Sequence, residues 1–258
     1  MSDPRAARTV AGALAAVSGL VLASGLAAGC SSHQPAASGL AALTPGQILS
    51  RADAAAKAAG SMHFSSTSKV GRSSIVFSDD SAPGGGQQDI TMPGGGKMTV
   101  VVVSGVGYVD GNAVALNEFL SFPALTATQL AGRWISFTSH DPDYQEVVNG
   151  VTTGSVLGEI DPVGKLVKTP PQTVDGQVVV GVRGPAPASS QMPKGSTITL
   201  YVAATGRPLP VSCQEGSGSN VTDFTLSRWG EHVSVSAPTQ AVPVPTTPSA
   251  PSGPPSTL

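Results

Sequence analysis

Basic residues are too few in this sequence to form a surface for nucleic acid. Its 258 residues include 14 Lys and Arg against 16 Asp and Glu, for a formal net charge of -2. Nucleic-acid binding depends on Lys and Arg side chains that neutralise backbone phosphates. We therefore expect no nucleic-acid partner.

Aromatic and charged side chains are also scarce, at 4% and 12% of residues. A domain with so few rings must fill its interior with Val, Leu, Ile and Ala. Gly and Pro are abundant, at 31 and 22 residues. This composition is compatible with an incompletely filled interior, although a genome rich in Ala, Gly, Pro and Val codons produces it as well.

Motifs of the common hydrolase, metal and redox sites are missing. The chain has no Gly-x-Ser-x-Gly, His-Glu-x-x-His or Cys-x-x-Cys sequence. His232 follows Glu231, but adjacent residues of a strand point to opposite faces, so the two do not form a dyad. Asp141-Pro-Asp143 is more typical of a turn than of a calcium loop. We expect no enzyme, no cofactor and no metal.

The N-terminus carries the clearest motif, Leu26-Ala27-Ala28-Gly29-Cys30. Small residues followed by Cys end a bacterial lipoprotein signal, whose Cys receives a diacylglyceryl group before cleavage. Arg5 and Arg8 supply a positive start, and Val10 to Ala28 supply an apolar run. A transmembrane helix, which needs about 20 apolar residues, is the alternative. The Gly-Cys ending and the polar stretch after it favour lipidation of Cys30, which would anchor the chain on the extracytoplasmic face of the cell membrane.

Cys213 is the second of only two cysteines. With Cys30 lipidated, no intrachain disulfide is possible. No Lys, Arg or His adjoins Cys213 in sequence to lower its pKa. We expect a small buried side chain rather than a reactive thiol.

Composition divides the chain into four parts. In order these are a signal peptide at 1–29, a flexible tether at 30–43, one folded domain at 44–238 and a Pro/Ser/Thr-rich disordered tail at 239–258.

The folded part is predicted to begin with a helix from Pro45 to Ala59. Thr44 and Gln47 have the spacing of a capping box, and Pro45 suits the first helical position. Gly60 ends the helix. The predicted apolar stripe is Ile48, Ala52, Ala55 and Ala59.

After Gly60 the pattern changes to the alternation of strands. Met62, Phe64 and Ser66 are predicted to share one face, and Ser196–Ala203 alternates in the same way. The β-branched run Thr99 to Val103 predicts a strand buried on both faces or the wall of a barrel. Further strands are predicted at Ile75–Phe77, Val178–Arg183, Phe224–Leu226 and Val233–Val235.

Turns are predicted where Pro, Gly and Asp cluster. Two Pro-Gly-Gly-Gly pieces, at 83–86 and 93–96, suit hairpin connections, and Asp110-Gly111 and Asp175-Gly176 suit tight hairpin turns. The section between these two Asp-Gly pairs, residues 117–164, has helical or loop character. This order predicts an α+β fold with a large antiparallel sheet, which tends to curl and leaves a cleft under helices on its concave side.

Several pieces resemble a known group of proteins. These are "LTPGQILSRADAAAKAAGSMHFSSTSKVG", "VVVVSGVGYVDGN", "STITLYVAATGRPLPV" and "VTDFTLSRWGEHVSVSAP". From Thr44 to Pro238 the chain is similar to mycobacterial and actinobacterial lipoproteins of the LppX/LprG type. The resemblance implies a strongly curved antiparallel half-barrel, LolA-like, with helices over its concave face. It also implies a hydrophobic cavity for the acyl chains of a lipid or glycolipid carried across the cell envelope.

Large apolar residues are the candidates for the lining of such a cavity. They are Val100, Val102, Phe119, Leu120, Phe122, Leu125, Leu130 and Trp134. The alternative is that they pack as a solid core. A filled domain would favour a second function, an anchored envelope protein whose surface binds a protein or a wall polymer.

Overall fold

Within residues 39–70, 73–188, 195–217 and 220–245, which the computed structural model describes, thirteen strands form one sheet. These residues belong to a single unit, Ala37–Leu258. The predicted signal peptide, Cys30 and residues 246–258 lie outside the described residues.

The sheet is almost entirely antiparallel and open, because its pairing order begins and ends on different strands. From one edge the order is β13 (Val242–Pro243), β6 (Ile135–Phe137), β5 (Val106–Gly111), β4 (Lys97–Val103), β3 (Gly85–Thr91), β2 (Ser73–Ala82), β1 (Met62–Val70), β12 (Asn220–Ser227), β11 (Pro210–Ser217), β10 (Thr197–Ala203), β9 (Gln177–Pro185) and β7 (Val167–Lys168). The short β8 (Gln172–Val174) also pairs with β9, and β13 with β6 is the parallel pair.

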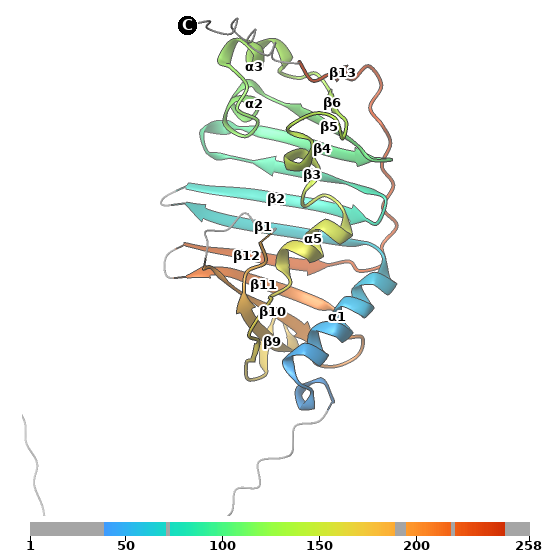
Figure 1. Cartoon of the computed structure of the whole chain (residues 1–258), viewed down its shortest axis with the longest axis vertical. Coiled ribbons are helices and arrows are strands. Elements are labelled where there is room, and N and C mark those ends of the chain that lie inside the picture. Colours follow the sequence, from blue (N-terminus) through green and yellow to red (C-terminus); the bar gives the residue numbers. More distant parts are fainter. Residues whose placement is uncertain (1–38, 71–72, 189–194, 218–219, 246–258) are drawn as a thin grey trace, which may run out of the picture. The chain divides into compact units, whose positions relative to one another are not determined.

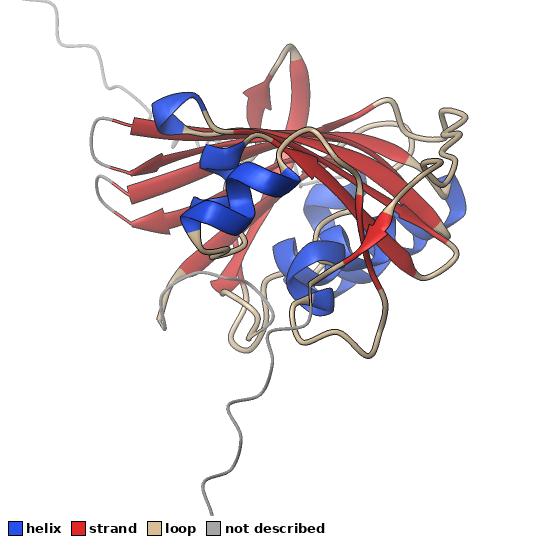
Figure 2. Ribbon diagram, turned by 90° about the horizontal axis from the view of Figure 1, so that it is seen from above, coloured by secondary structure: helices blue, strands red, loops and turns tan. Residues whose placement is uncertain are grey.

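Helices cover the sheet in two groups (Figure 1). The groups are α1 (Pro45–Ala59) with α5 (Thr153–Ile160), and α2 (Ala113–Glu118) with α3 (Ala124–Leu130) and α4 (Tyr144–Val148). Two 3-10 helices add short turns at Gly39–Ala42 and Pro93–Gly95. Figure 2 shows the curvature of the sheet, with helices in its hollow. The predicted α+β class, with a strongly curved antiparallel sheet, is confirmed.

Helix α1 has the predicted start and end. The backbone N–H of Gln47 donates to Thr44 Oγ1 at 3.4 Å, and the Thr44 N–H donates to Gln47 Oε1 at 3.0 Å. Gly60 ends the helix with a φ of 84°. The fully buried stripe is Ile48, Ala52 and Ala56, whereas Ala55 and Ala59, predicted to belong to it, are half-buried.

Strand register fixes which side chains face the helices. Phe64 on β1 lies opposite Leu226 on β12 and Asp79 on β2, and Ser66 lies opposite Phe224 and Phe77. Met62, Phe64 and Ser66 are all buried, as predicted. Alternation then places His63 and Ser65 on the convex face.

The predicted hairpin turn at Asp110-Gly111 is wrong. This pair ends β5, and the Asn112 side chain that follows accepts from Ala115 N–H at 3.0 Å to cap α2. The hairpin between β4 and β5 turns instead at Ser104 and Gly105, with φ of 52° and 77°. Asp175-Gly176 does form the predicted turn, with φ of 48° and 77°.

The C-terminal part of the domain also differs from its prediction. Val233 and Val235 are not in a strand of the described chain; this segment instead runs beside Gln87, Thr99 and Val101. It leads to β13, so ordered structure continues past residue 238, where the sequence predicts the start of a disordered tail. Backbone bonds explain this, because Val242 N–H donates to the Trp134 carbonyl at 2.9 Å. At the other end, the Gly39–Ala42 turn lies within the predicted tether.

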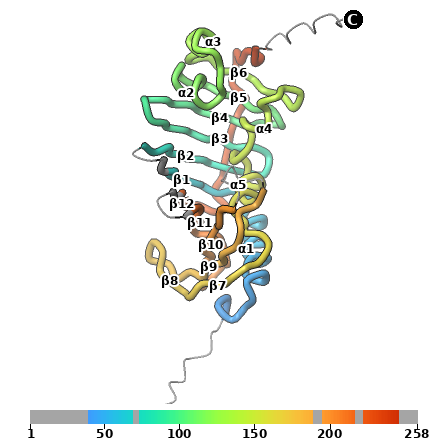
Figure 3. Tube along the Cα trace, turned by 60° about the vertical axis from the view of Figure 1, so that its left-hand side comes forward, coloured from blue at the N-terminus to red at the C-terminus, as the bar shows by residue number. Residues whose placement is uncertain are grey.

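Two separate apolar cores lie under the two helix groups, and Figure 3 shows α1 and α5 at one end of the sheet and α2 and α3 at the other. The first core joins α1 and α5 to β9–β12 and includes Ile48, Ile160, Val182, Leu200 and Leu226. The second core joins α2–α4 to β3–β6 and includes Ile90, Val100, Leu116, Ile135 and Phe137. The central strands lie between the two cores, and the candidate site is there.

Candidate functional site

A cavity of about 290 Å³ opens on the concave face between the two cores. Its floor lies on β1, β2 and β12, and on β1 and β12 small side chains replace the large ones found on either side. Ser66, Ser68 and Thr222 are these residues, and Thr222 Oγ1 donates to Ser68 Oγ at 3.2 Å. The hollow therefore comes from short side chains in the middle of a continuous sheet.

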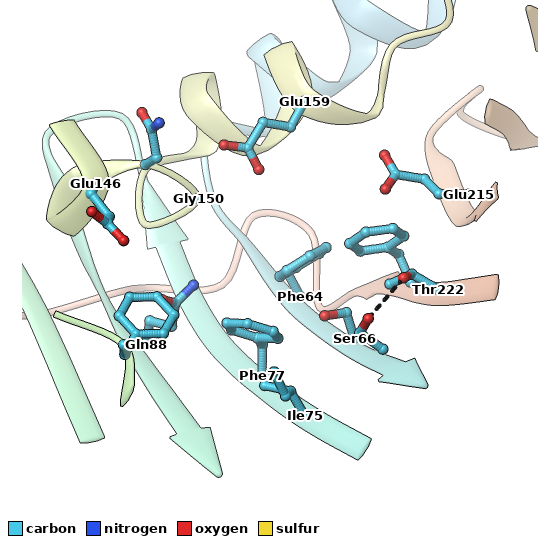
Figure 4. A pocket seen from close by; sticks show the side chains of 14 residues that line it. Phe64, Ser66, Ile75, Phe77, Gln88, Glu146, Gly150, Glu159, Glu215 and Thr222 are labelled. Atoms are coloured by element: carbon cyan, nitrogen blue, oxygen red, sulfur yellow. Dashed lines mark hydrogen bonds between the residues drawn. The ribbon is translucent and has the colours of Figure 1, made fainter. Parts of the chain in front are cut away.

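Aromatic rings form the apolar side of the cavity. Phe64 and Phe224 stack with ring centroids 5.3 Å apart and an interplanar angle of 27°. Phe77 and Ile75 continue this surface along β2, and Phe119 reaches it from the segment after α2. Figure 4 shows Phe64 and Phe77 on the floor strands. A surface of this kind favours hydrocarbon over water.

Acidic side chains border the opposite side (Figure 4). Glu146 comes from α4, Glu159 from α5 and Glu215 from β11, and Gln88 on β3 adds an amide. Within the described chain, no Lys, Arg or His is among the residues that line the cavity. One side of the cavity is thus apolar and the other is acidic, without a compensating cation.

Glu215 is the most deeply placed of the three lining carboxylates. Its residue is only 4% exposed, and its Oε1 has no hydrogen-bond partner in the part of the chain that the structure describes. Burial, with the nearby charge of Glu159, raises the pKa of Glu215 to about 7. Burial alone raises the pKa of Glu159 to about 7.

Asp79 lies next to the cavity, beside Gln88. It is 1% exposed; Gln88 Nε2 donates to its Oδ2 at 3.2 Å, while its Oδ1 has no partner among the described residues. Burial raises the pKa of Asp79 to about 8 despite the bond from Gln88. Near neutral pH this carboxyl is therefore largely protonated in the folded state.

Of the eight predicted lining residues, only Phe119 borders this cavity. The second core instead contains the other five buried ones, which are Val100, Val102, Leu120, Phe122 and Leu130. In this structure the five side chains belong to a packed apolar cluster. They pack against α2 and α3, one helix group away from the hollow.

Leu125 and Trp134 do not border this cavity either, for a different reason. Helix α3 buries Ala127 and Leu130, which turns Leu125 outward and leaves it 72% exposed. Trp134 lies beside Val101 and Pro238 in a shallow hollow. Val101 alternates with Val100 and Val102 along β4, so this hollow is on the convex side of the sheet.

The sequence contained usable signals for the residues that were missed. The alternation of β1 predicts that Ser66 shares a face with Met62 and Phe64, so this small residue interrupts a row of apolar side chains. Cys213 was predicted to be buried, and it is 2% exposed. Glu215 follows Cys213 by two residues on β11 and therefore faces the same way.

Other site types find little support among the described residues. No group of three or more His, Cys, Asp or Glu side chains in that part of the chain could hold a metal ion. His63 contacts Asp80 through Nδ1 and Oδ1 at 2.8 Å, on the face opposite Phe64. In the described ranges, no helix is long and apolar enough to cross a membrane.

The comparisons with known proteins return solved structures of limited similarity. Neither a family model nor a curated protein matches the chain. LprF from Mycobacterium bovis is 18% identical over 75% of this chain and 96% of its own, with a TM-score of 0.48. The lipoprotein LppX of Mycobacterium tuberculosis is 18% identical over 75% of this chain and all 100% of its own, with a TM-score of 0.49. An uncharacterised conserved protein from Thermus thermophilus is 10% identical over 77% of this chain and 97% of its own, with a TM-score of 0.43.

Proposed function

We propose that the chain is a membrane-anchored, extracytoplasmic lipoprotein that binds the acyl part of a lipid or glycolipid in the concave cavity and carries it across the cell envelope. The observation that carries this proposal is the hollow over Ser66, with the stacked rings of Phe64 and Phe224 beside it. An open apolar surface in the middle of a sheet is unfavourable in water unless a ligand covers it.

The size of the cavity limits what it holds. Small-molecule sites usually measure about 300–1,000 Å³, and this cavity, at about 290 Å³, lies just below that range. It suits one acyl segment better than several whole chains. Each buried CH₂ group contributes about 0.8 kcal/mol, so even a partly enclosed chain adds useful affinity before ordering costs are subtracted.

The section 117–164 supports a carrier rather than a filled domain. Part of it, with Leu120 and Leu130, closes the second core. The rest roofs the cavity, because Phe119, Glu146 and Glu159 all border it. The second candidate function, an envelope protein that binds a protein or wall polymer through its surface, has no comparable observation in its favour.

The membrane anchor is the other half of the proposal. It is supported by the Leu26-Ala27-Ala28-Gly29-Cys30 sequence and the apolar run before it. A diacylglyceryl group on Cys30 would hold the domain beside the bilayer from which a lipid is taken. Sequestration in place of transport would need the same anchor and the same cavity.

Uptake of a fluorescent fatty-acyl probe by the purified protein tests the binding step. Ser66→Leu places a larger side chain in the hollow and is expected to abolish saturable uptake. Ser65→Leu changes the neighbouring residue on the opposite face and is expected to leave uptake unchanged. Equal uptake by the two variants, or no uptake by the unmodified chain, would overturn the proposal.

A further inference from the structure

The position of Glu215 is determined by strand pairing. On β11 it lies opposite Ile198 of β10 and Thr222 of β12, in a row that continues to Ser68 of β1. This row faces the helices, so the carboxylate is enclosed between the sheet and α5. Figure 4 shows the Glu215 side chain beside the cavity, across from Glu159.

An unpartnered carboxylate in such a place is unfavourable for folding. Burying a charged or hydrogen-bonding group without a partner costs free energy. Glu215 Oε1 has no partner among the described residues, and its neighbours in the row are an Ile and a Thr that already bonds to Ser68. The site is chemically incomplete in the absence of a donor that comes from outside the described chain.

Charges on the surrounding elements do not supply this donor. Helix α5 presents Glu159, helix α4 presents Glu146, and both line the same cavity as Glu215. Arg183 on β9 is directed to the convex face, where its Nη2 donates to Thr197 Oγ1 at 3.3 Å. Lys57 of α1 is paired with Asp53 at 2.7 Å and is exposed. The ionisable side chains that line the cavity are therefore all acids.

We propose, on the basis of the amphiphile-binding function above, that the occupant has a cationic amine at its polar end, which donates hydrogen bonds to Glu215 and Glu159 while its hydrocarbon lies on Phe64, Phe77 and Phe224. A primary ammonium group has three donors and no acceptor. Charge-assisted hydrogen bonds to carboxylates are stronger than neutral ones. A phosphate or carboxylate head group would instead be repelled by the three lining acids.

The raised pKa values of Glu215 and Glu159, each about 7, agree with this arrangement. Without an occupant, burial keeps these carboxyls partly protonated near neutral pH. An ammonium group favours their ionised forms, so its binding releases protons. Affinity for an amine should accordingly increase from about pH 5.5 to about pH 8.

Three probes with the same chain separate the head-group inference from the proposed function. Dodecylamine, dodecanol and dodecanoate are titrated into the purified full-length protein below their micelle concentrations. Dodecylamine is expected to bind at least about tenfold more tightly than dodecanol, and dodecanoate most weakly. If dodecylamine binds no better than dodecanol, the inference is wrong and acyl binding stands. If none of the three binds, the proposed function itself fails.

Variants of the acids test which side chain selects the amine. Glu215→Gln should bring the affinity for dodecylamine close to that for dodecanol and leave dodecanol binding unchanged. Glu159→Gln should do the same to a smaller extent and provides a second readout if Glu215→Gln does not fold. Glu118→Gln, on the exposed side of α2, is the matched control and should change neither affinity. Unchanged amine preference in both Glu215→Gln and Glu159→Gln would overturn the inference.

Discussion

Phe64 and Phe224 stack across neighbouring strands, with ring centroids 5.3 Å apart and an interplanar angle of 27°. They are diagonal neighbours, because the register pairs Phe64 with Leu226 and Phe224 with Ser66. Two large rings therefore lie beside a single small side chain on the same face. This contrast between Phe and Ser produces both the apolar surface and the space above it.

Removal of one ring of this pair is expected to weaken both binding and folding. Phe224→Ala should lower the free energy of unfolding by roughly 1–3 kcal/mol, less than for a fully buried Phe because Phe224 is half-buried. It should also lower affinity for an acyl probe. Urea unfolding and probe titration measure the two effects. Leu125→Ala, at an exposed position, is the control and should change stability by less than about 0.5 kcal/mol. If Phe224→Ala binds the probe as tightly as the unmodified chain, Phe224 is not part of the surface that contacts the acyl chain.

The free energy of unfolding is expected to fall as pH rises. Burial raises the pKa of Asp79 from 3.8 to about 8, so the folded state binds more protons than the unfolded state between these values. The stabilisation from Asp79 is complete below its pKa in the unfolded state. It is lost as pH rises through its pKa in the folded state. Glu159 and Glu215, with pKa values raised to about 7, act in the same direction. A loss of a few kcal/mol from about pH 5 to about pH 8 is expected.

Asp79→Asn tests the source of this pH dependence. An amide keeps an acceptor for Gln88 Nε2 but cannot ionise, so the variant should be more stable than the unmodified chain near pH 8 and show a shallower slope. Asp175→Asn, at an exposed turn, should reproduce the original slope. Equal slopes for the two variants would show that Asp79 is not the group responsible.

The roof of the cavity depends on a close approach at Gly86. A Cβ atom there would lie 2.3 Å from the Val151 carbonyl oxygen and 2.7 Å from that of Asp80. Gly86→Ala should therefore push the loop before α5 away from β3 and destabilise the fold by more than about 2 kcal/mol. Gly84→Ala, where no atom lies within 4 Å, is the matched control. Thermal unfolding of both variants gives the comparison, and similar melting temperatures would contradict the close packing of this loop.

The lipid anchor is tested by Cys30→Ser. Because only a thiol accepts the diacylglyceryl group, and cleavage follows its attachment, the variant should lack the mass of the lipid and keep residues 1–29, which intact mass spectrometry measures. Cys213→Ser should keep the mass of the lipid and lack residues 1–29, since this thiol is buried in the fold. Retention of the lipid by Cys30→Ser would show that the N-terminal motif was misread.

Local rules were sufficient to predict much of the fold. The capping box at Thr44, the alternation through Met62 and Phe64, and the Asp175-Gly176 turn each depend on neighbours a few residues away, and all three are confirmed. The turn at Asp110-Gly111 was wrong because Asn112 caps a helix there. The same dipeptide suits either role, and only the following helix decides between them.

The candidate site was harder to predict because it depends on register between distant strands. Large apolar residues in 117–164 were expected to surround the cavity, yet Leu120 and Leu130 complete a separate core. The cavity is instead defined by small residues, Ser66 and Thr222, which come together only when β1 pairs with β12. The sequence shows which residues are apolar. Strand pairing decides where small residues from different strands come together and leave a space.

Native mass spectrometry of the purified protein, with extraction and identification of any bound molecule, tests the central claim most directly. The account predicts one amphiphile per chain, with a single acyl segment enclosed and a nitrogen at its polar end, lost in Ser66→Leu and retained in Ser65→Leu. A protein that has only its own mass, including the lipid on Cys30, and that takes up no added dodecylamine or dodecanol would contradict it.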